Sequence, residues 1–70
     1  MSNPRAKLIA KIAALTTEQI EAALVVINKR WNEYKQEERM VRAYMVDEFQ
    51  ARMGEDATDA ILDKLEAMAA

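Results

Sequence analysis

The stretch "IEAALVVINKRW", residues 20–31, decides the fold of this chain. Its apolar residues Ile20, Leu24 and Ile27 recur at the three- and four-residue spacing of one helix face. The two valines that follow Leu24 point to other sides of the same helix. The stretch therefore predicts a helix that is apolar on more than one side, and the fold has to cover each of these sides.

The same apolar face continues towards the C-terminus, and no glycine or proline interrupts it before Gly54. Its near-3.5-residue spacing favours one continuous helix over residues 17–53, about 54 Å long at 1.5 Å per residue. The members of this face are Ile20, Leu24, Ile27, Trp31, Tyr34, Val41, Met45 and Phe49. The alternative is a break within "NEYKQEER", residues 32–39, because this segment is polar and Glu38 occupies an apolar position of the pattern.

Capping signals define the start of two helices. Asn3 is expected to cap a helix over residues 4–15, with Pro4 at its first position, where the missing N–H costs nothing. Thr16 stands three residues before Gln19, which is the spacing of a capping box. The long helix is therefore expected to begin directly after Thr16, next to the first helix.

Gly54 fits the C-terminal cap of the long helix, and Asp56 is a candidate start for a third helix over residues 57–68. The predicted fold class is therefore all-α, with three helices in short, long, short order. We expect residues 1–70 to form a single small helical domain.

The small size of the chain predicts that its fold needs stabilisation beyond that of its own core. A 70-residue chain buries only about 60% of its unfolded surface, so its own core gives marginal stability. The usual helpers are disulfides, bound metals and oligomerisation, and the sequence contains neither cysteine nor histidine. Oligomerisation is the helper that remains.

The predicted dimensions also favour a partner chain. The two short helices together span about 39 Å, less than one face of a 54 Å helix. A second copy would cover the remaining apolar residues and complete a helical bundle as a homodimer. The candidate interface residues are Val25, Val26, Met40, Tyr44 and Met53. The alternative is that the short helices of the same chain enclose the valines.

The residue types present argue against an enzyme. Nucleophilic triads of the familiar kind need histidine or cysteine, and a phosphate-binding loop needs more than one glycine. Adjacent acids on a helix point about 100° apart, so neighbouring carboxylates do not share a site. We expect no catalytic residues, no metal and no cofactor, and a small regulatory module that binds another protein.

Nucleic-acid binding is the alternative function, for a regulator of transcription or of plasmid or phage biology. The expected long helix carries several cations with aromatic residues between them. The candidate contacts are Lys29, Arg30, Lys35, Arg39 and Arg42. Five acidic residues lie between Lys29 and Arg52, and the net charge of the chain is −2, which opposes binding to phosphates. A structural subunit of a larger assembly is the third alternative.

Charge is divided unevenly between the two ends of the chain. Residues 1–15 carry three cations and no acid, which gives +3, and residues 55–70 carry five acids and one lysine, which gives −4. We expect these ends to attract each other within the chain or across a dimer, with a strength that falls as salt rises. Ordinary solvated helix faces, with acids early in a helix, explain the same pattern.

Nothing in the sequence predicts a membrane segment. No apolar run approaches the roughly 20 residues that a membrane span needs, and Lys11 interrupts the apolar part of the N-terminal segment. We expect a cytoplasmic protein of a bacterium or phage, without a membrane partner.

Residues 6–52 resemble, in length and helix order, the small Hha-type modulators that bind bacterial nucleoid proteins. The residues that carry the resemblance are Glu18, Glu21, Asn28, Met40, Arg42 and Ala43. The family has an Asp-His-Arg stretch where this chain has Met45, Val46 and Asp47, and its polar break between helices is replaced here by "KRWNEYKQEER". No residue role is transferred on this basis.

Overall fold

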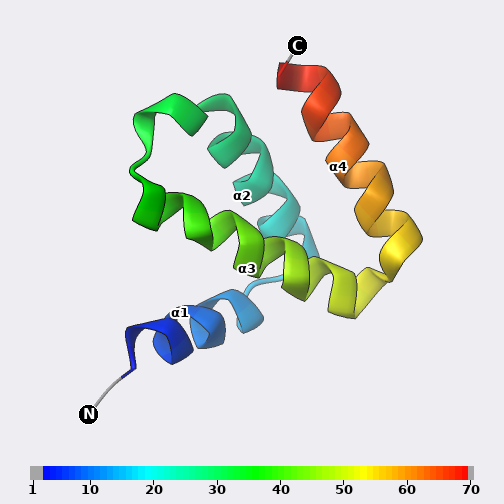
Figure 1. Ribbon diagram of the computed structural model, residues 1–70. Helices are drawn as coiled ribbons and strands as arrows, with labels where there is room; N and C mark the ends of the chain where they lie inside the picture. Colours follow the sequence, from blue (N-terminus) through cyan, green and yellow to red (C-terminus); the bar gives the residue numbers. More distant parts are fainter. Residues whose placement is uncertain (1–2, 70) are drawn as a thin grey trace.

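The computed structural model describes residues 3–69, and all regular structure within that range is helical (Figure 1). Its four α-helices are α1 (Pro4–Ala13), α2 (Thr17–Lys29), α3 (Gln36–Met53) and α4 (Glu55–Ala69). A short 3₁₀ turn, η1 (Trp31–Glu33), lies between α2 and α3. The all-α class is as predicted, but the number of helices is four and not three.

The predicted caps of the first two helices are confirmed. The Asn3 side chain accepts a hydrogen bond from the Arg5 N–H at 3.0 Å, and Pro4 opens α1. Thr16 Oγ1 accepts from the Gln19 N–H at 3.1 Å, while Gln19 Oε1 accepts from the Thr16 N–H at 2.8 Å. Two orphan donors are thereby satisfied at the start of α2. α1 ends at Ala13, two residues before the expected end.

The predicted continuous helix over residues 17–53 is wrong, and the chain breaks in the polar segment that was the alternative. α2 ends at Lys29, and Lys35 is extended, with φ −73° and ψ 161°. The Lys35 N–H donates to Glu38 Oε1 at 3.0 Å, which starts α3. Glu38 therefore interrupts the apolar pattern because its carboxylate caps a new helix.

The break lets the two halves of the apolar stripe face each other. Because the chain reverses over residues 30–35, α3 packs back on α2, and α4 lies across both (Figure 1). Among the described residues, the core consists of eight buried apolar side chains, namely Ile12, Ile20, Leu24, Ile27, Met45, Phe49, Ile61 and Leu65. The long-rod geometry that favoured a partner is thus absent, and α2 is covered on its main apolar face by its own chain.

Trp31, expected on the core stripe, lies outside the core. It belongs to η1, where the backbone has left the α-helical path, and its side chain is exposed. Tyr34, three residues later, is partly buried against the core. The reversal of the chain therefore removes only the larger aromatic residue from the apolar interior.

Gly54 makes the sharp connection between α3 and α4. Its φ of +91° and ψ of 170° lie in a region that only glycine occupies without strain. Thr58 Oγ1 donates to the Gly54 carbonyl at 2.8 Å, and α4 begins at Glu55, two residues before the expected start. Gly54 thus ends one helix, as predicted, and directly precedes the next.

Replacing Gly54 with alanine is expected to destabilise the fold by about 1–3 kcal/mol through backbone strain. No atom lies within 4 Å of a Cβ built at this position, so steric contact adds nothing to that cost. Urea denaturation followed by circular dichroism measures the change. An unchanged midpoint would contradict the left-handed geometry of the turn.

Arg52 ties α3 to the connection between α1 and α2. Its Nη2 donates to the Ala13 carbonyl at 3.0 Å and its Nη1 donates to Thr17 Oγ1 at 3.4 Å. Its Nε donates to Glu48 Oε2 at 2.8 Å, in a partly buried ion pair. One planar guanidinium group therefore holds three helices in register.

Replacing Arg52 with lysine is expected to lower the free energy of unfolding by about 1–2 kcal/mol, because lysine keeps the charge but loses the fork of donors. The change in the urea midpoint measures this effect. Gln50→Lys, at an exposed position of the same helix, is the control and should leave the midpoint unchanged. Equal midpoints for both variants would show that the fork does not order the connection.

The resulting domain is small and slightly extended. Its radius of gyration is 12.3 Å, against about 11 Å for a compact chain of this length. Within residues 3–69, none of the helices has both the length and the apolar character needed to cross a bilayer. With eight buried apolar side chains, the monomer has little stability to spare.

Candidate protein-binding surface

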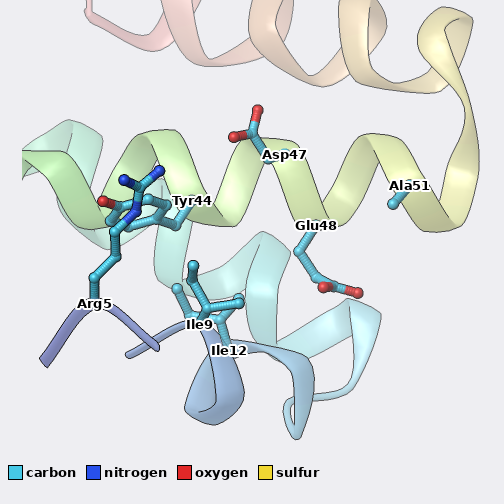
Figure 2. A pocket seen from close by; sticks show the side chains of 7 residues that line it. All are labelled: Arg5, Ile9, Ile12, Tyr44, Asp47, Glu48 and Ala51. Atoms are coloured by element: carbon cyan, nitrogen blue, oxygen red, sulfur yellow. The ribbon is translucent and has the colours of Figure 1, made fainter. Parts of the chain in front are cut away.

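A groove of about 220 Å³ lies between α1 and α3 (Figure 2). It is lined by Arg5, Ile9, Ile12, Tyr44, Asp47, Glu48 and Ala51. Its floor is apolar and its charged groups stand at the rim, which is the usual character of a surface that receives an apolar side chain of a ligand. We call this feature the α1–α3 groove.

Helical spacing explains why these side chains share the groove. Ile9 and Ile12 are three residues apart, so both lie on the side of α1 that faces α3. Ile12 is buried, but Ile9 stays 42% exposed because it lies at the open side of the groove. Tyr44 and Ala51 are seven residues apart and lie on one side of α3.

The two ends of the groove differ in charge. The Arg5 guanidinium carbon lies 5.6 Å from the centre of the Tyr44 ring at one end, as Figure 2 shows. Glu48, towards the other end, is neutralised by Arg52, whereas Asp47 has no ion-pair partner among residues 3–69. The groove therefore has a cationic end and an anionic side, with apolar surface between them.

The predicted interface residues are not brought together into one patch. Met40 lies one turn before Tyr44 on the groove side of α3 and is 53% exposed. Met53, also 53% exposed, is nine residues after Tyr44 and therefore points about 180° away. Val25 is partly buried against the core, and Val26 is 48% exposed on the outer side of α2.

This scattering follows from the break in the chain. The grouping of Val26 with Met40 depends on one straight helix over residues 17–53, and it no longer holds because α3 reverses on α2. Ile9 is not among the candidate interface residues, although its side chain is exposed in the groove. Leu8, Ile9 and Ile12 span about 100° of α1, which is an ordinary width for a core-facing apolar stripe, so the sequence pattern carries no sign of this exposure.

The candidate nucleic-acid residues gather around the turn between α2 and α3, where their charges are mixed with acids. Arg30 forms a two-pronged ion pair with Glu33, with Nε–Oε2 at 3.0 Å and Nη2–Oε1 at 3.3 Å. Arg39 and Arg42 lie over the Trp31 ring. The structure therefore brings aromatic and cationic groups together, but with acidic neighbours.

The Arg30–Glu33 ion pair shifts the pKa of both residues. The hydrogen bond and the charge of Arg30 hold the pKa of the Glu33 carboxyl below its ordinary value of 4.5, and the same contacts raise the pKa of Arg30. The support that Glu33 gives to the turn is therefore fully present above pH 4.5 and is lost as pH falls through its lowered pKa. Both groups are exposed, so this support is weak and screened by solvent.

The hydroxyl groups of the threonines serve structural contacts. Thr16 caps α2, Thr17 accepts from Arg52, and Thr58 donates to the Gly54 carbonyl. Among residues 3–69, no group of three or more His, Cys, Asp or Glu side chains is arranged to hold a metal ion.

Comparison with protein families, with curated proteins and with solved structures finds no match to this chain. The resemblance of residues 6–52 to Hha-type modulators therefore has no support from a family model.

Proposed function

We propose that this chain is a small, non-enzymatic protein-interaction module that acts as a homodimer through the α1–α3 groove. The observation that supports this most directly is the exposure of Ile9, which lines the groove, and of Met40, which lies one helical turn before the groove residue Tyr44. Large apolar side chains gathered beside a groove are typical of interaction surfaces. Methionine adapts its shape to a partner, which suits Met40 to such a contact.

The energetics of a small domain favour the same proposal. A core of eight side chains gives a monomer only a few kcal/mol of stability, and a partner that binds the folded state adds to it. A second copy seated on the groove would cover Ile9 and Met40, which the chain's own helices leave in water. The dimer would then present its remaining surface to another protein.

The test of this proposal is the mass of the intact chain in solution, measured by light scattering at low micromolar concentration. One chain has a mass of 8.0 kDa, and we expect the measured mass to be twice this value. Because the groove contact is mainly apolar, the mass should not fall below that of two chains when salt is raised. A mass of one chain throughout the micromolar range would refute the homodimer.

A further inference from the structure

Two arginines near the α2–α3 turn share one aromatic ring. The guanidinium carbons of Arg39 and Arg42 lie 4.9 Å and 5.9 Å from the centre of the Trp31 ring, and Arg39 Nε donates to the Trp31 carbonyl at 3.1 Å. Within residues 3–69, neither arginine has a carboxylate within 4.0 Å. We call these three residues the arginine corner.

The outer side of α4 carries the opposite charge. Five exposed acids lie on it within about 100° of the helix circumference, counted at 100° per residue. They are Glu55, Asp56, Asp59, Asp63 and Glu66, and none has an ion-pair partner in the described part of the chain. Lys64, the cation of this helix, points towards α2 and lies 3.9 Å from Glu21. We call the five acids the acidic face.

The arginine corner and the acidic face of one chain point away from each other. α4 turns Ile61 and Leu65 to the core, so its acids face outward. In Figure 1 the turn between α2 and α3 lies at one side of the molecule and α4 at the other. The basic N-terminal helix α1 packs mainly on α3, so it does not neutralise α4 either. The predicted attraction between the two ends of the chain is therefore not made by an ion pair among residues 3–69.

We propose that the acidic face of one copy binds the arginine corner of a second copy. Two guanidinium groups on one ring repel each other, and carboxylates inserted between them form charge-assisted hydrogen bonds with both. Because the contact joins two different surfaces on opposite sides, it repeats head to tail and is distinct from a two-fold groove contact. Charge attraction also makes it weaken as salt rises.

A protein carboxylate suits this corner better than a nucleic-acid backbone. Glu33, Glu37 and Glu38 lie in the same part of the chain, and the whole protein has a net charge of −2. A long run of phosphates would meet these acids, whereas a few carboxylates need only reach Arg39 and Arg42. An acidic helix that projects its charges to one side meets that requirement.

The test uses the intact chain and the emission of Trp31, the single tryptophan. Light-scattering mass and Trp31 emission are followed against concentration at roughly 50 and 200 mM salt. At low salt we expect the mass to rise above that of the groove dimer and the emission to change over the same concentrations. At high salt the half-maximal concentration should increase at least tenfold.

Charge reversal identifies the surfaces. Arg39→Glu with Arg42→Glu should abolish the low-salt association, as should Asp59→Arg with Asp63→Arg, and the chain that carries all four changes should regain it. Lys7→Glu with Lys11→Glu, a reversal of the same size on α1, is the matched control and should keep it. Circular dichroism confirms that each variant is folded.

If the fourfold variant does not regain the low-salt association, the head-to-tail contact is overturned. A wild-type mass that is independent of salt would overturn it as well. A Trp31 emission that responds to a single-stranded oligonucleotide and not to protein concentration would also overturn it, in favour of nucleic acid. None of these results affects the groove dimer, whose mass is measured at high salt.

Discussion

Replacing Leu24 with alanine is expected to lower the free energy of unfolding by about 2–5 kcal/mol. Leu24 is fully buried at the centre of α2, in a core with Met45 and Phe49 of α3 and Leu65 of α4. Truncation removes its contacts with these helices and leaves a cavity that the short helices cannot close without shifting. Because a domain of this size has only about 5 kcal/mol in total, much of the variant should be unfolded at 25 °C.

Urea denaturation at a fixed protein concentration measures this loss, since association makes stability depend on concentration. Val26→Ala is the matched control. It lies two residues further along α2 with a half-exposed side chain, and should shift the free energy by no more than about 0.5 kcal/mol. Equal losses for the two variants would contradict the orientation of α2 described above.

Replacing Met40 with lysine is expected to raise the dissociation constant of the groove dimer by tenfold or more, which leaves mainly monomer at low micromolar concentration. In the dimer the methionine side chain would be buried on the groove side of α3, one helical turn before Tyr44. A lysine there brings a charge into an apolar contact, and moving a charged group out of water into such a contact is costly. Light scattering at roughly 200 mM salt gives the mass without head-to-tail contacts.

Met53→Lys is the matched control for this prediction. Met53 has the same 53% exposure on the same helix, but it points to the opposite side from Tyr44. The substitution adds the same charge and should leave the dimer mass unchanged. If Met53→Lys dissociates the dimer and Met40→Lys does not, the interface lies on the other side of α3 and the groove proposal is wrong.

Local signals in the sequence predicted several helix starts and ends correctly. Thr16 and Gln19 cap each other, Asn3 caps the first helix, and Gly54 ends α3, because each of these contacts involves residues within a few positions. The apolar spacing of residues 20–49 also identified five of the eight core residues, namely Ile20, Leu24, Ile27, Met45 and Phe49. These features depend on local geometry, which the sequence carries directly.

The break between α2 and α3 could not be settled in the same way. A stripe with a near-3.5-residue period is equally apolar whether the helix runs straight or reverses, so the period contains no information about the turn. The decision depends on the gain from packing Ile20 and Leu24 against Phe49, which is a tertiary effect. Glu38 is the local sign of the break in the sequence. Its carboxylate caps α3 by accepting from the Lys35 N–H, and this contact exists only when a new helix starts there.

The candidate surface was predicted only in part, for the same reason. Met40 and Tyr44 are one turn apart and remain neighbours in any helix that contains both. Val26 and Met53 were related to them through a straight helix that does not exist. The contribution of Arg5 and Ile9 depends on where α1 docks against α3, and no local pattern determines that position.

The chain reversal at residues 30–35 also bears on how fast the domain assembles. Each principal contact joins α-helices that are adjacent in the chain or separated by one other α-helix. Loops closed over such short distances lose little entropy, and helical domains with mainly local contacts fold within microseconds to milliseconds. A newly made chain would therefore spend little time with its apolar stripes exposed, which limits its opportunity to aggregate before it finds a second copy.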